Sequence, residues 1–173
     1  MNIIASFDQH KLGHIDPTDQ KISFSRQAAR AVLTNQNKQI AVMNFTKNGS
    51  FKLPGGGVDD GEDIVEALHR EIEEETGYHI TNIKELGVVE EDRYFCGMHQ
   101  TSYCFTADVT DFVGTKLTEH ERSEGMNLRW AQSIDEAISW VKSGNTVDED
   151  GSAIGLAMMQ LRDSTILDAA REN

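Results

Sequence analysis

A glycine-rich turn followed closely by a well-delimited helix is the feature that most limits the fold of this chain. Residues 54–57 are Pro-Gly-Gly-Gly, a run that a regular helix would not contain. Asp63 and Glu66 have the spacing of a capping box, and Gly77 supplies a stop signal at the far end. The sequence therefore predicts a helix over residues 63–76, entered from a turn whose backbone can approach another group closely.

The predicted helix carries an apolar stripe and, beside it, an acidic arc. The apolar positions are spaced to face a core, and they are Val65, Leu68 and Ile72. Three glutamates project from a neighbouring side, because positions i, i+3 and i+4 share one face of a helix. These glutamates are Glu71, Glu74 and Glu75. The acidic arc is therefore expected at the edge of a groove rather than far out in solvent.

Like charges this close together weaken an isolated helix. Each pair costs a few tenths of a kcal/mol, and Glu75 also lies near the negative, C-terminal end of the helix dipole. Helices with several exposed glutamates are common, so the arc alone favours a solvated acidic face. A bound divalent cation is the other explanation, because carboxylate oxygens are the ligands that Mg²⁺ prefers. A backbone carbonyl of the glycine turn could complete the coordination.

Arg70 lies where it can connect the acidic arc to the turn. It can pair with Glu66 or Glu74 at i−4 and i+4, or reach back to Glu62. Its expected role is to fix the geometry of turn and helix. A glycine turn at a fixed distance before Glu62, Arg70 and Glu71 is improbable by chance, and the whole pattern therefore outweighs the explanation as a plain acidic surface.

Together these residues resemble the Nudix box of the MutT/Nudix hydrolases. The matching pattern is Gly56, five residues, Glu62, seven residues, and then Arg70-Glu71-Ile72-x-Glu74-Glu75-x-Gly77. The one departure is Tyr78, where the family usually has Ile, Leu or Val. That is a packing position and does not touch the chemistry. The resemblance is highly specific for the family and says little about the substrate.

The resemblance implies a Mg²⁺-dependent enzyme, with Mn²⁺ as an alternative ion, that hydrolyses the pyrophosphate bond of a nucleoside diphosphate linked to another group. Carried over by position, Glu71, Glu74 and Glu75 would bind the metal together with the Gly56 carbonyl, and one glutamate would serve as general base. Arg70 and Glu62 would be the orienting pair. The alternative is a non-catalytic Nudix domain that senses a nucleotide, although such domains usually lack one or more of these glutamates.

Family members often take a further acid from outside the box, as a metal ligand or as the base. Glu124 is the candidate here, because it stands just before a predicted strand over residues 126–131, where the family often places one. The rival positions are Glu90, Glu91, Glu119 and Glu121. For each of these residues alone, an ordinary surface glutamate is the plainer explanation.

The substrate is less well defined. The proline that marks many ADP-ribose enzymes is absent from residues 91–96. Tyr94 lies where diadenosine polyphosphate enzymes tend to have a tyrosine, although a packing role is the plainer explanation. The candidate substrates are therefore NTPs or dNTPs, nucleotide sugars and dinucleoside polyphosphates.

Strands and helices alternate irregularly through the rest of the chain. Apolar patterns predict further strands over residues 26–33, 39–45, 51–53, 83–90, 101–109 and 126–131. A second helix follows Ser133 and stops at Gly144, an acidic loop spans residues 147–151, and the C-terminal segment 153–173 carries the last helix, to about residue 169. Residues 1–22 form an extension, as a short strand or a loop over the sheet. This order predicts an α/β fold, a Nudix-like α/β/α sandwich with a mixed β-sheet, as a single domain over residues 1–173.

The formal net charge of −13 limits the partners. A surface this acidic repels a nucleic-acid backbone, which argues against a protein that binds a duplex. A phosphate substrate can still bind if divalent ions bridge it to the protein. The expected partner is therefore a small nucleotide, and analogy with relatives adds a homodimer formed through residues 1–22 or the last helix.

The location expected from the sequence is the cytoplasm. No stretch approaches the roughly 20 apolar residues that span a bilayer. Residues 1–10 lack the basic and apolar regions of a secretory signal. The two cysteines, Cys96 and Cys104, fit neither a disulfide framework nor a zinc pattern, so both are expected to be free thiols.

Overall fold

The computed structural model describes residues 1–13, 21–144 and 152–172, and the predicted acidic loop 147–151 lies outside the described residues. The strands are β1 (Ile3–Asp8), β2 (Phe24–Thr34), β3 (Ile40–Phe45), β4 (Ser50–Lys52), β5 (Gly55–Gly57), β6 (Tyr78–Arg93), β7 (Met98–Phe112) and β8 (Met126–Ala131). The helices are α1 (Ile64–Thr76), α2 (Glu119–Ser123), α3 (Ile134–Ser143) and α4 (Ser152–Arg171), with short 3₁₀ helices η1 (Gln9–Leu12) and η2 (Tyr94–Cys96).

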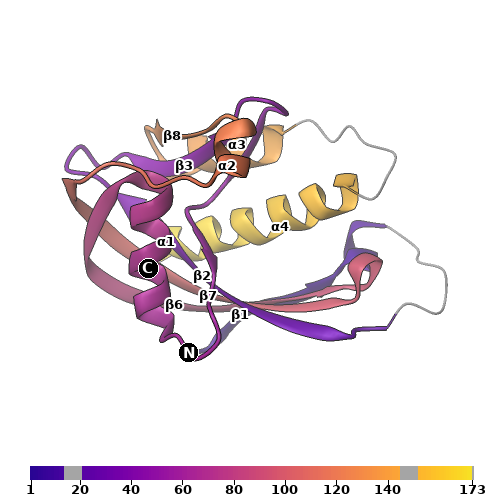
Figure 1. The fold of residues 1–173 in the computed structure, drawn as a ribbon. Helices are drawn as coiled ribbons and strands as arrows, with labels where there is room; N and C mark the ends of the chain where they lie inside the picture. The colour runs from indigo at the N-terminus through magenta and orange to yellow at the C-terminus, as the bar shows by residue number, and fades with distance from the viewer. Residues whose placement is uncertain (14–20, 145–151, 173) are drawn as a thin grey trace.

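The strands of the described residues form one mixed sheet of eight strands (Figure 1). Six strands follow the order β1-β6-β7-β2-β3-β4, while β5 pairs with β2 and β8 pairs with β3. The pairs β1/β6 and β2/β7 are parallel, and the other pairs are antiparallel. The mixed sheet that the sequence predicts is confirmed. For residues 1–22 the sequence left a strand and a loop open, and Ile3–Asp8 form strand β1 of the sheet.

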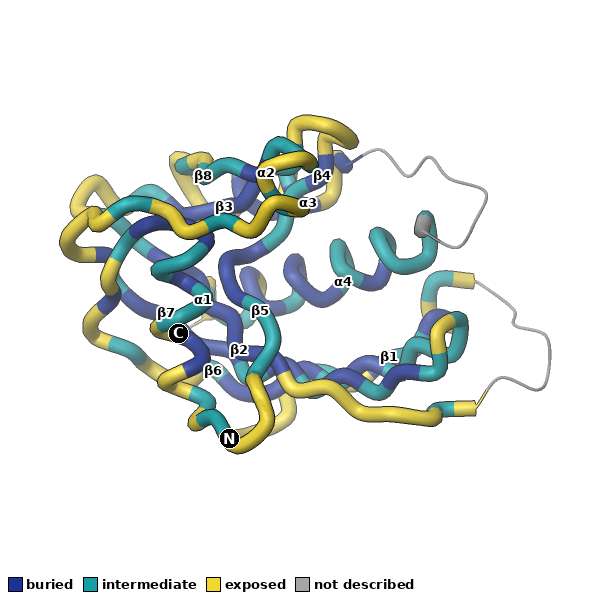
Figure 2. The backbone as a smooth tube through the Cα atoms, viewed as in Figure 1, coloured by how far each residue is buried: buried dark blue, intermediate teal, exposed yellow. Residues whose placement is uncertain are grey.

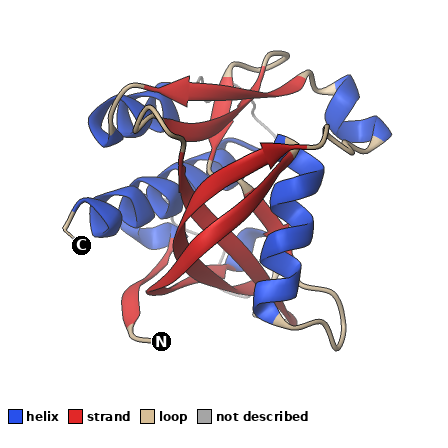
Figure 3. Cartoon of the chain, turned by 90° about the vertical axis from the view of Figure 1, so that its left-hand side faces the viewer, coloured by secondary structure: helices blue, strands red, loops and turns tan. Residues whose placement is uncertain are grey.

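Helices cover both faces of this sheet (Figure 3). On one face, Leu68 and Ile72 of α1 pack in a buried cluster with Phe105 of β7. On the other face, Val141 of α3 and Met158 of α4 belong to a second buried cluster. Each cluster removes apolar side chains from water, which is the main stabilising contribution to folding. Two cores on opposite faces of one sheet make an α/β/α sandwich, as predicted.

Strand β2 runs through the middle of the sheet and changes from exposed to buried along its length. Residues 24–27 are exposed, whereas residues 28–33 are buried (Figure 2). The buried half is an apolar run, as expected for a strand covered on both faces, but it is interrupted by Arg30, which is only 5% exposed. This buried arginine lies next to the glycine turn.

The glycine turn is itself part of the sheet, which the sequence does not predict. Gly55 and Gly56 pair with Arg30 and Ala29 of β2 in antiparallel register. Gly55 has a φ of 125°, and a Cβ there would lie 2.2 Å from the Ala29 carbonyl oxygen. Only glycine fits so close to another backbone with this φ. The glycines therefore allow β5 to lie against β2.

The start of α1 differs in two details from the prediction. Asp63 caps the helix by accepting the N–H groups of Val65 (2.8 Å) and Glu66 (3.3 Å). Within the described residues, the return bond from the Asp63 N–H to Glu66 does not form, so the capping box is incomplete. The Glu62 carboxylate accepts the Asp59 N–H in the turn before the helix. Val65 is exposed rather than core-facing, since it lies in the first turn, at the rim of the apolar contact. In the described parts of the chain, no helix is long and apolar enough to cross a membrane.

Candidate active site

The side chain of Arg70 connects α1 to the residues that precede the helix. Its guanidinium binds Glu62 in a two-pronged pair, with Nε to Oε1 at 2.8 Å and Nη2 to Oε2 at 2.7 Å. The same Nη2 donates to the Gly57 carbonyl at 3.0 Å. The bonds from Arg70 and the Asp59 N–H lower the pKa of Glu62 to about 2, and the bond to Glu62 raises the pKa of Arg70. Of the partners considered for Arg70, Glu62 is therefore the main one.

Glu71 lies directly over the glycine strand. Its Oε1 accepts a hydrogen bond from Arg70 Nη1 at 2.8 Å. Its other oxygen lies so close to Gly56 that a Cβ on the glycine would be 2.1 Å from Oε2. The side chain of Glu71 is 16% exposed, so the carboxylate is at the surface of the groove rather than in solvent. The structure thus brings together two of the sequence-predicted metal ligands, Glu71 and Gly56.

Glu74 is the most open of the three glutamates of the arc. Its side chain is 40% exposed, and Oε2 lies 3.5 Å from the same Arg70 nitrogen that binds Glu71. Two carboxylates therefore share one guanidinium. Glu74 keeps most of its lone pairs available to a ligand.

Glu75 is the most buried of the three glutamates and has partners of its own. It is 2% exposed, and its carboxylate binds Lys52 Nζ at 2.5 Å and the Gly55 N–H at 2.9 Å. Burial raises the pKa of Glu75, and the neighbouring Lys52 opposes this rise. Within the described residues, no three Asp, Glu, His or Cys side chains are gathered so as to hold a metal ion. Ion pairs with Arg70 and Lys52 instead balance the carboxylates of the arc.

The donor set nevertheless suits a hard divalent cation. It consists of the carboxylates of the arc and the backbone of Gly56, and oxygen atoms of this kind are the usual ligands of Mg²⁺. The contact between Gly56 and Glu71 already places a carboxylate against this backbone. A cation here could also bind Glu75 if that side chain exchanged Lys52 for the ion. The residues present therefore fit a magnesium site that Glu71, Glu74, Glu75 and Gly56 could form.

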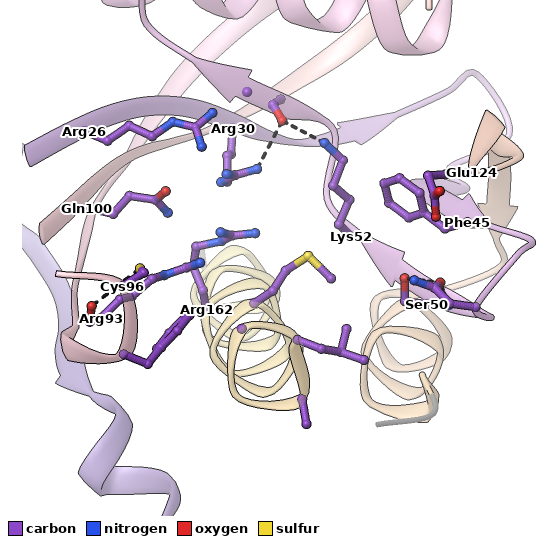
Figure 4. Close-up of a pocket in the computed structure, with 18 of the residues that line it drawn as sticks. Arg26, Arg30, Phe45, Ser50, Lys52, Arg93, Cys96, Gln100, Glu124 and Arg162 are labelled. Atoms are coloured by element: carbon purple, nitrogen blue, oxygen red, sulfur yellow. Dashed lines mark hydrogen bonds between the residues drawn. The ribbon is translucent and has the colours of Figure 1, made fainter. Parts of the chain in front are cut away.

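A cavity of about 610 Å³ opens beside the glycine strand (Figure 4). It is bordered by Gly55 and Gly56 on one side and by residues of α4, including Leu156 and Met159, on another. Of the five candidate acids outside the helix, only Glu124 lines this cavity. Glu124 ends α2 and binds Lys47 at 2.8 Å, which lowers its pKa.

The rival acids have other partners or positions. Glu91 is fully buried and binds Arg93 and Gln100 at 2.6 and 2.7 Å. Glu121 forms a capping box with Thr118 at the start of α2. Glu90 and Glu119 do not line the cavity, and neither does Tyr94, whose ring centroid is 5.6 Å from that of His10.

The sequence does not predict the basic residues of the cavity. They are Arg26, Arg30, Lys52, Arg93 and Arg162. One signal was present, because a charged residue within the apolar run 28–33 requires a buried partner. The others come from distant parts of the chain that only the folded sheet brings together. Both cysteines are free, as predicted, but only Cys104 is buried, whereas a buried or half-buried position was expected for both. Cys96 is exposed and lines the cavity, and burial raises the pKa of Cys104 to about 12.

Comparisons with known proteins give a consistent assignment. A family model described as NUDIX domain matches residues 24–146. A CMP-5'-(N-acetyl-N-hydroxy-3-aminopropyl)phosphonate hydrolase of Streptomyces rubellomurinus is 33% identical over 140 residues, which cover 77% of this chain and 64% of that protein. A putative 8-oxo-dGTP diphosphatase of Bacillus subtilis is 34% identical over 95 residues, covering 52% of this chain and 64% of that protein.

The matched stretch is thus slightly less than two thirds of each of these curated relatives. A solved NUDIX hydrolase from Nitrosomonas europaea is 23% identical and superposes with a TM-score of 0.56, covering 76% of this chain and 87% of that one. At this level of identity, the likeness shows a shared fold.

Proposed function

Because this chain belongs to the NUDIX domain family, we propose that it is a Mg²⁺-dependent hydrolase that cuts the pyrophosphate bond of a nucleoside diphosphate linked to another group. The observation that carries the proposal is the arrangement around Arg70, which holds Glu62, Gly57 and Glu71 in one network beside a cavity. The names of the two curated relatives both describe hydrolysis or phosphatase activity on nucleotide compounds.

The proposed metal ligands are Glu71, Glu74, Glu75 and the Gly56 carbonyl. When bound, the ion would neutralise phosphate charge and make attack by water easier. Mn²⁺ is the alternative ion, because it accepts the same oxygen ligands.

The protein itself contributes position and charge. Phosphoryl transfer depends mainly on positioning and electrostatic stabilisation. Arg70 holds the Glu71 carboxylate and the Gly57 carbonyl at 2.8 and 3.0 Å, so helix and strand keep a fixed distance. Glu62 in turn orients Arg70, which makes Arg70 and Glu62 positioning residues. Of the contacts that Arg70 makes, the ion pair with Glu62 is the best defined, because two hydrogen bonds join the two side chains.

A glutamate is the proposed proton acceptor. Glu74 is the better placed of the two catalytic candidates, because it is 40% exposed whereas Glu71 is 16% exposed and bonded to Arg70. Glu124 lines the cavity beside Gly56, which Glu71 and Glu74 do not line, and is the proposed further acid, although it must first leave Lys47. Glu71 and Glu74 carry the chemistry in this proposal, and Glu124 assists.

A panel of nucleotides tests the function. It comprises dNTPs, oxidised dGTP, ADP-ribose, nucleotide sugars and dinucleoside polyphosphates, each incubated with the full chain and Mg²⁺, with products identified. Hydrolysis of a P–O–P bridge that stops on addition of EDTA supports the proposal. Tight nucleotide binding without turnover, with Mg²⁺ or Mn²⁺, would instead assign the chain as a non-catalytic nucleotide sensor.

A further inference from the structure

The cavity beside the glycine strand is basic in a protein whose net charge is −13. Five cationic side chains line it: Arg26, Arg30, Lys52, Arg93 and Arg162. Glu124 is the one acidic residue among the described lining residues, and it already pairs with Lys47. Figure 4 shows the four arginines grouped on the side of the cavity away from Glu124. The cavity therefore concentrates positive charge against the sign of the whole molecule.

Acidic partners balance only part of this positive charge. Lys52 pairs with Glu75, and Arg93 pairs with Glu91 at 2.6 Å. Arg162 also has acidic partners, because it binds Asp163 at 2.7 Å and lies 3.7 Å from Glu91.

Arg26 and Arg30 have no carboxylate partner within the described residues. The Arg26 side chain is exposed and makes no hydrogen bond or ion pair in the described part of the chain, and the Arg30 side chain donates only to the Gly55 carbonyl at 3.1 Å. The carboxylates of Asp163, Glu91 and Glu75 act on Arg30 through their charge without a hydrogen bond in the described structure. The two guanidinium groups therefore have donors at the cavity that no carboxylate accepts.

Arg30 gives the strongest evidence that the cavity binds a ligand. It is 5% exposed, and its Nε has no hydrogen-bond partner in the described structure. Burial and the neighbouring charge of Arg162 lower its pKa to about 10. Buried donors in native proteins almost always have a partner, and each exception requires an explanation. An anion in the cavity would supply the missing acceptor and would offset the repulsion between Arg30 and Arg162.

We propose that this cavity binds a second anionic group of the substrate, a phosphate, phosphonate or carboxylate at the end of the leaving moiety. The inference rests on the proposed function and narrows its substrate class. A guanidinium is suited to such groups, because its planar fork can donate two parallel hydrogen bonds to one anion. A neutral leaving group would leave Arg26 without an anionic partner and the Arg30 Nε without a charged acceptor.

The position and size of the cavity agree with this assignment. Arg30 and Lys52 both donate to the Gly55 carbonyl, at 3.1 and 3.3 Å, which places the basic groups one residue from Gly56 (Figure 4). A volume of about 610 Å³ lies within the range of small-molecule sites and exceeds what one phosphate needs. Phe95 and Met159 line the same space and can contact the body of the moiety. A substrate with its diphosphate at Gly56 can therefore reach the arginines with an anionic group of its leaving moiety.

The first arm of the test measures binding of inorganic phosphate to the full chain by calorimetry, in EDTA. The variants are Arg30→Gln and Arg26→Gln. Because the Arg26 side chain is exposed, the Arg26→Gln variant should fold like the wild type. Arg129→Gln is the matched control, because Arg129 lies over the Trp140 ring outside the cavity. Loss of one charge-assisted hydrogen bond should weaken binding about tenfold. Phosphate that fails to bind, or binds equally to wild type, Arg26→Gln and any folded Arg30→Gln, would overturn the inference.

The second arm asks whether the anion belongs to the substrate. UDP-glucuronate and UDP-glucose differ only in a carboxylate on the sugar, and their binding is compared by the same calorimetry. Wild type and Arg129→Gln should bind UDP-glucuronate about tenfold more tightly, and Arg26→Gln should lose most of this preference. Equal affinities would mean that the cavity holds a free anion, and the inference would be wrong. Neither arm needs turnover, so absence of hydrolysis would overturn the proposed function while leaving this site in place.

Discussion

Glu71 occupies the space that any side chain on Gly56 would need. A Cβ atom at Gly56 would lie 2.1 Å from Oε2 of Glu71 and 2.4 Å from its carboxyl carbon. The helix and the glycine strand are thus in direct contact at the two positions that the box assigns to the metal. This contact explains why glycine is required at position 56 without invoking an unusual φ.

Gly56→Ala should therefore impair activity. The added methyl must displace the Glu71 carboxylate, and a shift of about 1 Å in a reacting group can cost about 100-fold in rate. Gly57→Ala is the control, because its Cβ would meet only the flexible end of Arg26, at 3.1 Å. Measurement of kcat/KM and Tm for both variants checks this. Wild-type turnover in Gly56→Ala would show that the contact is not needed.

Glu74→Gln should lower kcat strongly and leave the fold unchanged. The side chain is 40% exposed and makes only a 3.5 Å ion pair, so its loss removes a ligand or base rather than a packing contact. General-base catalysis typically contributes about 10²–10⁴-fold. Glu66→Gln, an exposed change on the same helix, should retain full activity. Equal loss in both variants would point to the charge of the helix as a whole instead of Glu74.

Lys52→Met should destabilise the fold through Glu75. Removing one partner of a buried ion pair typically costs about 3–5 kcal/mol, because the other charge remains buried and unpaired. The pair is 2.5 Å long, with side-chain exposures of 15% for Lys52 and 2% for Glu75. In a double-mutant cycle by urea unfolding, Glu75→Gln should recover much of the loss. Additive effects of the two substitutions would show that the pair is not coupled.

The ion pair between Glu62 and Arg70 should make stability depend on pH. Arg70 and the Asp59 N–H lower the pKa of Glu62 from 4.5 to about 2 in the folded chain. A lowered folded pKa contributes stability above the unfolded value, and this contribution is lost as the pH falls from about 4.5 toward 2. Urea midpoints of wild type and Glu62→Gln should therefore differ at pH 7 and converge on acidification. A difference that stays constant down to pH 3 would exclude this linkage, and Glu66→Gln should show none.

The part of the site that lies on α1 is predictable because its determinants are local. Asp63 and Gly77 delimit the helix, and the helical period places Glu71, Glu74 and Glu75 on neighbouring sides. The strands and the two covered faces of the sheet also follow from apolar patterns. Local pattern is sufficient where neighbours in sequence determine the structure.

The remaining features depend on residues far apart in the chain. Three glycines carry no strand signal, and β5 forms only because β2 lies beside it. The turn of Glu75 toward Lys52 depends on β4, and the basic cavity joins residues of β2 with Arg162 of α4. No periodicity within one segment contains this information. The resemblance predicts Glu124 as the acid outside the box, and this residue does line the cavity, but nothing local in the sequence predicts its pairing with Lys47.

We propose that Glu71 and its neighbours use a divalent ion to cut a pyrophosphate bond. The most direct test is Mg²⁺-dependent turnover of the nucleotide panel by wild type and Glu71→Gln, with product identification and Glu66→Gln as the control. We expect cleavage of at least one P–O–P bridge by wild type and by Glu66→Gln, abolished by EDTA and reduced about 100-fold or more in Glu71→Gln. Equal turnover in Glu71→Gln, or turnover that persists in EDTA, would contradict the account.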